Sequence, residues 1–137
     1  MPSAAYVKYT NAIEPMLEAM NAGTDAWKVA LSTTFTATDV TFTPGTTDLA
    51  TGGGYTAGGN AVTTTSSAMA AGVYKLVLTS PAVWTATTGF TFRYAILWDS
   101  TTSVPVASWD YGSSQVVAAT ETVTVTLDAT NGVFTAS

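Results

Sequence analysis

The 137-residue chain has the length of one domain and carries few charges: 9% of its residues are charged, and its net charge at neutral pH is −5. Its acidic and basic residues are scattered singly, which argues against nucleic acid as a partner because phosphate contacts need clustered lysine and arginine. The chain contains neither cysteine nor histidine, which excludes zinc sites, Ser-His-Asp triads and Cys-His pairs, so we expect a non-enzymatic protein without a metal or other cofactor.

Residues 1–23 are predicted to form an amphipathic helical segment. Its large side chains recur at three- and four-residue spacing, as one stripe made of Tyr6, Tyr9, Ile13, Met16, Leu17 and Met20. Pro15 lies inside the stripe and cannot donate a backbone hydrogen bond, so a kink or a second short helix is expected there. No basic stretch leads into an apolar core and no run approaches about 18 apolar residues, so neither a signal peptide nor a membrane span is expected.

The next two segments are predicted to be a strand and a long loop. Residues 26–31 alternate Trp27, Val29 and Leu31 with smaller or charged side chains, which is the period of a β-strand. Residues 32–60 are rich in threonine, glycine and aspartate, and we expect them to form a long ordered loop or arm within the single domain. Loops beyond about 12–15 residues are uncommon in compact domains and usually serve a function.

Residues 90–99, with the sequence FTFRYAILWD, are predicted to be the central strand of a sheet. Its larger side chains alternate along the chain and would share one face, formed by Phe90, Phe92, Tyr94, Ile96 and Trp98. Burial of such side chains contributes about 1.5–3 kcal/mol each. We therefore expect this face to be the buried one, and the face that carries Arg93, Ala95 and Leu97 to be the outer one.

Several further short strands are expected on either side of this central one. They are predicted at residues 61–65, 72–79, 82–85, 104–111, 121–127 and 133–136. Threonine supplies 28 of the 137 residues, and its β-branched side chain suits the half-exposed face of a sheet. About eight short strands separated by turns predict a mainly β protein, an antiparallel β-sandwich of jelly-roll type with an N-terminal helix.

Three features are candidates for chemistry, and each has a purely structural alternative. Asp99 and Asp110 would form a carboxylate pair if their hairpin is in register, or each caps a turn. The glycines at 52–54 and 58–59 superficially resemble a phosphate loop, but no Lys-Ser or Lys-Thr pair follows them. The four tryptophans form either a sugar-stacking platform or part of the core, and they are Trp27, Trp84, Trp98 and Trp109.

The order of several short motifs extends over most of the chain, from Tyr6 to Thr135. These motifs are the paired N-terminal tyrosines, WKVALS, GYTAGG, RYAILWD, WDYGS and the closing VTVTLDATNGVFT. In this order they resemble a family of small virion structural proteins of tailed bacteriophages. The resemblance implies a non-enzymatic protein of the phage head surface, made in the host cytoplasm, and specifically a capsid decoration or cement protein that binds the major capsid protein. A tail or adaptor component is the alternative within this class, and a carbohydrate-binding β-sandwich module is the alternative from a different class.

The low charge of the chain also suits burial between subunits, because neutral hydroxyls lose less hydration than charges when they are covered. We therefore expect a homo-oligomer, with a trimer as the working hypothesis. The expected contact residues lie in the arm and the N-terminal segment, and they are Gly52, Gly53, Gly54, Tyr55, Gly58, Gly59, Tyr6 and Tyr9. In this interpretation Tyr55 is an exposed aromatic anchor, and the arm at residues 45–60 stays mobile until assembly orders it.

Overall fold

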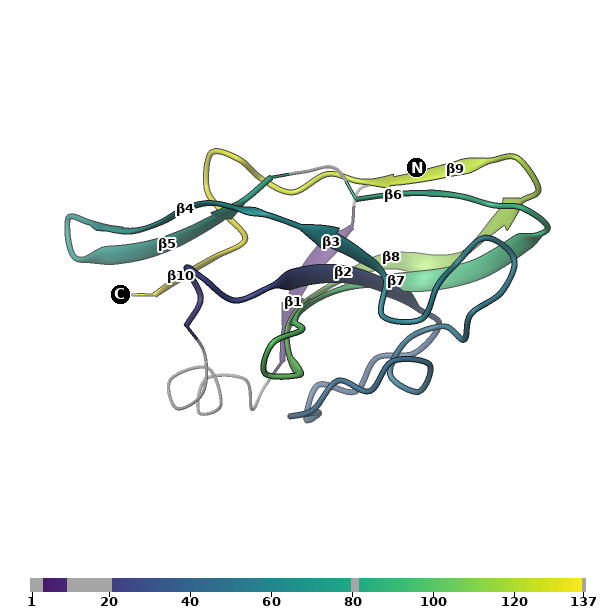
Figure 1. Cartoon of the computed structure of the whole chain (residues 1–137), viewed down its shortest axis with the longest axis horizontal. Coiled ribbons are helices and arrows are strands. Elements are labelled where there is room, and N and C mark those ends of the chain that lie inside the picture. The colour runs from purple at the N-terminus through teal and green to yellow at the C-terminus, as the bar shows by residue number, and fades with distance from the viewer. Residues whose placement is uncertain (1–3, 10–20, 80–81, 137) are drawn as a thin grey trace.

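The computed structural model describes residues 4–9, 21–79 and 82–136, and within these ranges the protein is mainly β (Figure 1). Its ten strands are β1 (Ala5–Lys8), β2 (Trp27–Ser32), β3 (Asn60–Val62), β4 (Thr64–Ala70), β5 (Val73–Leu78), β6 (Ala82–Thr85), β7 (Gly89–Asp99), β8 (Val104–Ala118), β9 (Thr122–Val125) and β10 (Phe134–Ala136). They pair into a five-stranded, a three-stranded and a two-stranded sheet, and every pair is antiparallel. The predicted class, mainly β with antiparallel sheets, is confirmed.

The largest sheet is organised around the strand that the alternating sequence FTFRYAILWD predicts. Its order is β1-β8-β7-β2-β3, so β7 pairs with β8 on one side and with β2 on the other. The three-stranded sheet has the order β10-β5-β4, and β6 pairs with β9 alone. The central position predicted for residues 90–99 is therefore confirmed.

The predicted N-terminal helix is wrong for the part of it that the structure describes. Residues Ala5–Lys8 form the edge strand β1, which pairs with β8, and the ring of Tyr6 packs edge-on against Trp109 at 6.0 Å. The sequence AYVK contains tyrosine and valine, which suit a strand, and the edge of β8 supplies backbone hydrogen-bond partners that a helix would not use. Residues 21–23 of the predicted segment are also not helical, and residues 1–3 and 10–20 lie outside the described residues.

An irregularity in the pairing of β7 with β8 divides the single apolar face that the alternation predicts. The pairing of β7 with β8 shifts between Phe92 and Tyr94, where Phe92 lies opposite Gln115 and Tyr94 lies opposite Asp110. The Arg93 guanidinium at this point forms a bidentate ion pair with Asp110, at 2.8 and 3.0 Å. The alternation is broken at this irregularity: Ala95 and Leu97 lie on the same face as Phe92, and Ile96 and Trp98 lie on the opposite one.

Both faces of the sheet are consequently buried in the second half of β7, so the prediction that only one of them is buried is wrong. On one face Phe92, Ala95 and Leu97 join the main core, which also contains side chains of β2, β6 and β9. On the other face Ile96 and Trp98 belong to a second, smaller core. A strand that is covered on both sides carries large side chains on both parities, and this is why the alternation in residues 90–99 gives way to the continuous run AILW.

The two cores lie on opposite faces of the five-stranded sheet, and a different segment of the chain packs over each. The β6–β9 ribbon lies over one face of the sheet, and the chain between β2 and β3 passes over the other (Figure 1). In this second cover the ring of Phe42 stacks on Trp98 with centroids 4.0 Å apart. Residues 33–59, between β2 and β3, contain only one isolated β-bridge.

The β4–β5 hairpin extends away from the body that the five-stranded sheet forms (Figure 1). Its base is anchored because Leu76 and Leu78 of β5 belong to the main core. At its tip Ala71 and Gly72 both have positive φ angles, 51° and 80°, which is the backbone of a two-residue hairpin turn whose twist matches that of the strands. The projecting segment is therefore a regular β-hairpin rather than an irregular loop.

The burial of both faces of β7 gives a stability prediction. We expect Ile96→Ala and Leu97→Ala each to lower the free energy of unfolding by about 2–5 kcal/mol, because each leaves a cavity in a different core. Val116→Ala, on a residue of β8 that is 75% exposed, is the control and should change it by less than about 0.5 kcal/mol. Denaturant unfolding curves measure all three, and a loss below about 1 kcal/mol for either core variant would show that its face is open to solvent.

Candidate functional site

The carboxylate of Asp48 fixes the long loop onto β2. It is buried and accepts hydrogen bonds from the backbone N–H groups of Gly45 and Gly58, both at 2.6 Å, and from the phenol of Tyr55. The Tyr55 oxygen in turn accepts a hydrogen bond from the backbone N–H of Leu31 at 3.0 Å. Burial and the hydrogen bond to Asp48 both raise the pKa of Tyr55, so the phenol keeps its proton and remains a donor to the carboxylate.

The glycines of the loop allow the chain to approach its own backbone. A Cβ atom at Gly53 would lie 2.0 Å from the carbonyl oxygen of Gly89, and one at Gly59 would lie 1.9 Å from that of Val29. A Cβ at Gly54 would meet the backbone of residues 85–87 within 3 Å. These three glycines also have positive φ angles. Both the backbone conformation and the lack of space for a Cβ atom therefore favour glycine at these positions.

The predicted contact residues differ in their exposure on a single chain. Tyr55 is 1% exposed and Tyr9 is 0% exposed, so neither ring is an exposed anchor on this chain. Tyr6 is 48% exposed beside Trp109, and Gly52 and the neighbouring Gly54 are at the surface. That assembly orders the arm at residues 45–60 stays a prediction, and in the single chain hydrogen bonds to Asp48 link this segment to β2 through Tyr55.

The two aspartates proposed as a carboxylate pair are not brought together. Asp99 pairs with Val104 at one end of β7, whereas Asp110 lies opposite Tyr94 and binds Arg93, which lowers its pKa. Asp99 instead lies beside Asp25, which is far from it in the sequence and which the sequence pattern did not indicate as a neighbour. Burial and then the Asp25 carboxyl raise the pKa of Asp99, while hydrogen bonds from Thr101 and Thr102 oppose the shift. The structural alternative, a carboxylate that caps a turn, describes Asp99 well.

The tryptophans do not form a shared sugar-stacking surface. Trp27, Trp84 and Trp98 are buried in the two cores, and Trp109 is half-buried beneath Tyr6. The indole of Trp27 donates to the carbonyl of Ala22, and that of Trp98 donates to the carbonyl of Gly58. The core alternative is therefore correct for these three rings.

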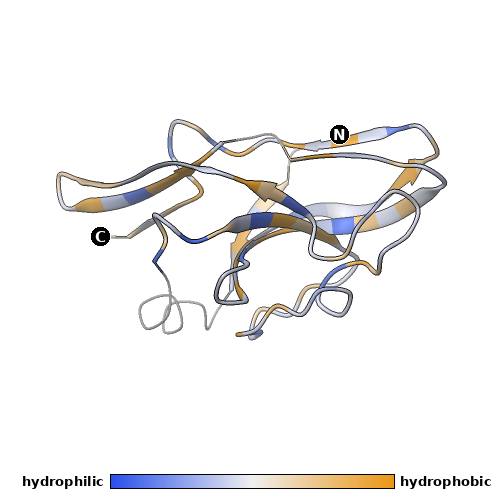
Figure 2. Cartoon of the chain, viewed as in Figure 1, coloured by the Kyte–Doolittle hydropathy of each residue, from blue (hydrophilic) through white to orange (hydrophobic). Residues whose placement is uncertain are grey.

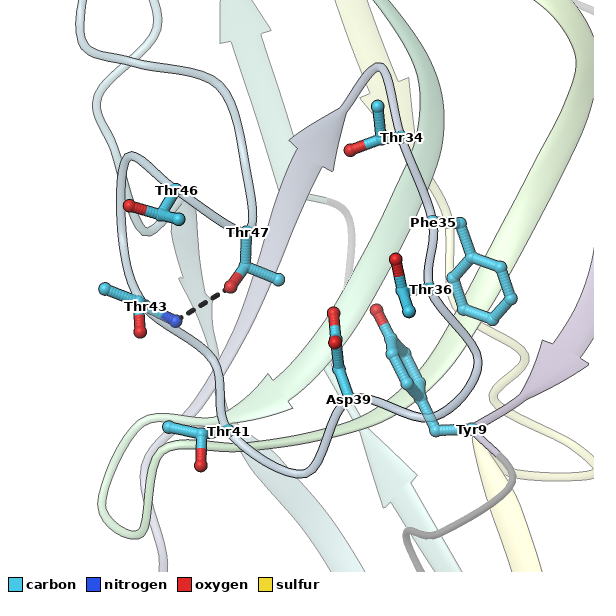
Figure 3. Close-up of a pocket in the computed structure, with 9 residues that line it drawn as sticks. All are labelled: Tyr9, Thr34, Phe35, Thr36, Asp39, Thr41, Thr43, Thr46 and Thr47. Atoms are coloured by element: carbon cyan, nitrogen blue, oxygen red, sulfur yellow. Dashed lines mark hydrogen bonds between the residues drawn. The ribbon is translucent and has the colours of Figure 1, made fainter.

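The same loop forms a pocket of about 290 Å³ whose walls are mostly threonine (Figure 3). Its lining residues are Tyr9, Thr34, Phe35, Thr36, Asp39, Thr41, Thr43, Thr46 and Thr47. Two turns shape the walls: the N–H of Asp39 donates to the carbonyl of Thr36, and the N–H of Thr43 donates to the hydroxyl of Thr47 at 2.9 Å. The pocket is a product of the fold of residues 33–47, and threonine spacing along the sequence does not reveal it.

Tyr9 is the most unusual residue of this pocket. Its ring packs edge-on against Phe35 at 4.8 Å, and its hydroxyl points toward the space beside Asp39 and Thr36 (Figure 3). Although the side chain is fully buried, the hydroxyl has no hydrogen-bond partner among the described residues. Burial, and secondly the negative charge of Asp39, raise the pKa of Tyr9, so the phenol stays protonated and can donate.

A second surface feature is the outer part of the β4–β5 hairpin. All seven residues of β4 are uncharged, and six of them are exposed. At the tip, residues 68–73 have the sequence AMAAGV, in which Met69 is 64% exposed, and Figure 2 shows this end as mostly hydrophobic. Strand β4 is also the edge of its sheet, so one side of its backbone has no strand partner in the described part of the chain.

Comparison of the chain with protein-family models, with curated proteins and with solved structures finds no match. Within the described ranges, no three or more acidic, histidine or cysteine side chains cluster as metal ligands would. The same ranges contain no helix with the length and apolar character of a membrane span. Function is therefore inferred from the pocket, the hairpin and the motifs of the sequence.

The hydrogen bonds of the Tyr55 hydroxyl predict that its removal lowers the stability of the protein even when the ring is kept. Tyr55→Phe keeps the ring but leaves the Leu31 N–H without its acceptor and removes the phenol from Asp48, so we expect the free energy of unfolding to fall by about 1–3 kcal/mol. Tyr74→Phe is the matched control, since its hydroxyl pairs with Ser67 at an exposed position and its loss should cost less than about 1 kcal/mol. Equal effects of the two changes in thermal or denaturant unfolding would contradict the role given to the Asp48 network.

The raised pKa of Asp99 predicts a pH dependence of stability. A carboxyl with a raised pKa stabilises the folded state most below the ordinary value of 3.8, and this contribution is lost as the pH rises through the folded-state pKa. An amide at this position would stay neutral and keep an acceptor for the N–H of Thr101, so Asp99→Asn should gain stability relative to the wild type as the pH rises from about 4 toward neutrality. Unfolding curves of both proteins across this range measure the difference, and a difference that is independent of pH would show that Asp99 is ionised at an ordinary pKa.

Proposed function

We propose that this protein is a structural subunit of a tailed-phage virion, and that it acts as a capsid decoration or cement protein through contacts between subunits and with the shell. The single observation that carries the proposal is the β4–β5 hairpin, which projects from the body of the five-stranded sheet and whose edge strand β4 is exposed and uncharged (Figures 1 and 2). The resemblance of the motif order to that of small phage virion proteins supports it. A trimer is the working oligomeric state, and an overall β-sandwich is part of the same proposal, supported by the packing of β6 and β9 against β2 and β7.

Within the residues that the structure describes, the edge strand β4 has few of the features that usually keep such edges from pairing. Edge strands of soluble proteins commonly carry lysine, proline, inward charges or a covering loop, because an open edge pairs readily with another chain. Thr64–Ala70 contains no charge and no proline, and its bulge, between Thr64 and Ser66, lies at the base. The ammonium group of Lys75, on the neighbouring strand β5, donates a hydrogen bond to the carbonyl of Thr130. A strand of this kind suits a partner that covers it.

The chemistry of the hairpin also suits burial against protein. Its hydroxyl groups can exchange hydrogen bonds with a partner, whereas charged groups would lose hydration that the partner must replace. Met69 is unbranched and adapts to irregular surfaces, and Val73 beside it adds apolar area. Strand addition at β4 would supply main-chain hydrogen bonds, and the tip would supply hydrophobic contact.

The hairpin gives the proposal a direct test. We expect Met69→Lys combined with Val73→Lys to prevent assembly and to reduce binding to purified heads of the phage that encodes the protein by about tenfold or more, because two charges would have to be desolvated. Light scattering after size-exclusion chromatography measures assembly, and co-sedimentation with heads measures binding. The stability of a single chain should change by less than about 1 kcal/mol, since both positions are exposed.

The matched control is Val116→Lys, which adds a charge at another exposed valine outside the hairpin. It should leave both assembly and binding unchanged. Quantification of the protein on purified particles adds an independent outcome: the decoration role requires a copy number comparable to that of the shell subunit. A low copy number on tails would support the tail or adaptor alternative, and absence from particles would reject the virion proposal.

A further inference from the structure

We propose that the threonine-lined pocket formed by residues 33–47 and Tyr9 binds a neutral polyhydroxylated ligand of about the size of one sugar ring. This proposal is independent of the assembly role, because the pocket lies in the loop under the five-stranded sheet, whereas the hairpin projects from the other end of the molecule (Figures 1 and 3). It also differs from a tryptophan platform, since no tryptophan is among the described residues that line this pocket.

The unpartnered hydroxyl of Tyr9 is the first observation that indicates a ligand. Buried polar groups in folded proteins are hydrogen-bonded in the large majority of cases, and each exception needs an explanation. The Tyr9 hydroxyl is fully buried, points into the pocket and has no partner within the described ranges of the chain. A bound molecule that accepts a hydrogen bond from this phenol would satisfy it.

The charge of the lining selects the class of ligand. Asp39 is the one charged residue among the nine described residues that line the pocket, and these nine include no lysine or arginine to attract an anion. Tyr9 keeps its proton and donates, whereas an ionised carboxylate only accepts. A ligand hydroxyl is a group that can accept from Tyr9 and donate to Asp39 at the same time.

The remaining walls suit the rest of a sugar ring. Threonine hydroxyls both donate and accept, so they can follow the varied directions of sugar hydroxyls, and their methyl groups, with the Phe35 ring, provide apolar contact for C–H faces. The volume, about 290 Å³, lies near the lower limit for small-molecule sites. It therefore suits one ring better than an oligosaccharide.

The test is an NMR titration of the full ¹⁵N-labelled chain with D-glucose, D-galactose, D-mannose and N-acetyl-D-glucosamine, each added separately to millimolar concentrations. We expect at least one sugar to cause saturable shifts that centre on the amides of Thr36, Asp39 and Thr43. Tyr9→Phe should raise the Kd for that sugar about five- to tenfold, because it removes one hydrogen-bond donor and leaves the ring in place. Tyr111→Phe is the matched control, because this tyrosine is half-buried and lies outside the pocket, and it should change the Kd by less than about twofold.

Asp39→Asn on the open wall provides a second variant that does not depend on the buried ring, and it should also weaken binding. Three outcomes would overturn the proposal. They are no saturable shift with any of the four sugars, saturation that neither Tyr9→Phe nor Asp39→Asn changes, and shifts at these amides with n-butylammonium alone. The last outcome would identify the pocket as a site for an ammonium group, such as a lysine side chain of a partner.

Discussion

The rest of the structure depends on the hydrogen bonds that the buried carboxylate of Asp48 accepts. An ionised group in a protein interior is tolerated when hydrogen bonds replace its lost water, and here two backbone N–H groups and the phenol of Tyr55 do so. These donors come from three separate points along residues 45–58. One charged side chain therefore closes a long, threonine-rich loop that has little regular secondary structure of its own.

Closure of the loop has consequences on both sides of β2. Through Tyr55 the network reaches the N–H of Leu31, and the N–H of Leu49 bonds to the carbonyl of the same residue, so the loop continues the edge of the sheet where β3 ends. The same loop brings Phe42 onto Trp98 and thereby covers the second face of β7. The second core and the threonine-lined pocket exist because this segment is fixed against the sheet, and a mobile arm would form neither.

Local periodicity predicted most of the strands, because alternation is a property of consecutive residues. It located the strands that became β2, β5, β6, β7 and β10 to within about two residues. It could not predict the pairing shift near Arg93, since that shift depends on the register with β8. It also could not predict the strand at Tyr6, since the spacing of Tyr6 and Tyr9 fits a helix until the edge of β8 is in place. Tertiary context overrode the local pattern at both positions.

The candidate sites were harder to predict for the same reason. The glycines at 53, 54 and 59 stood out in the sequence only as part of a glycine-rich stretch, and their close approach to the chain's own backbone is visible only in the folded register. Asp48 is a lone acid in a threonine-rich stretch, and its role depends on Tyr55 and Gly58 folding back toward it. The one available signal was the combination of an isolated acid, an aromatic residue and repeated glycines in a single loop, which is typical of a segment packed around a polar centre.

The distribution of surfaces makes the two proposed roles compatible. The body is closed on one face of its sheet by the β6–β9 ribbon and on the other by the loop, and the hairpin continues from this body in a different direction (Figure 1). A partner seated on β4 and the hairpin tip would cover an uncharged edge without approaching the wall that carries Asp39. Because Asp48 fixes the loop within a single chain, assembly is not needed to form the pocket, and the ligand site would be present on free and assembled subunits alike.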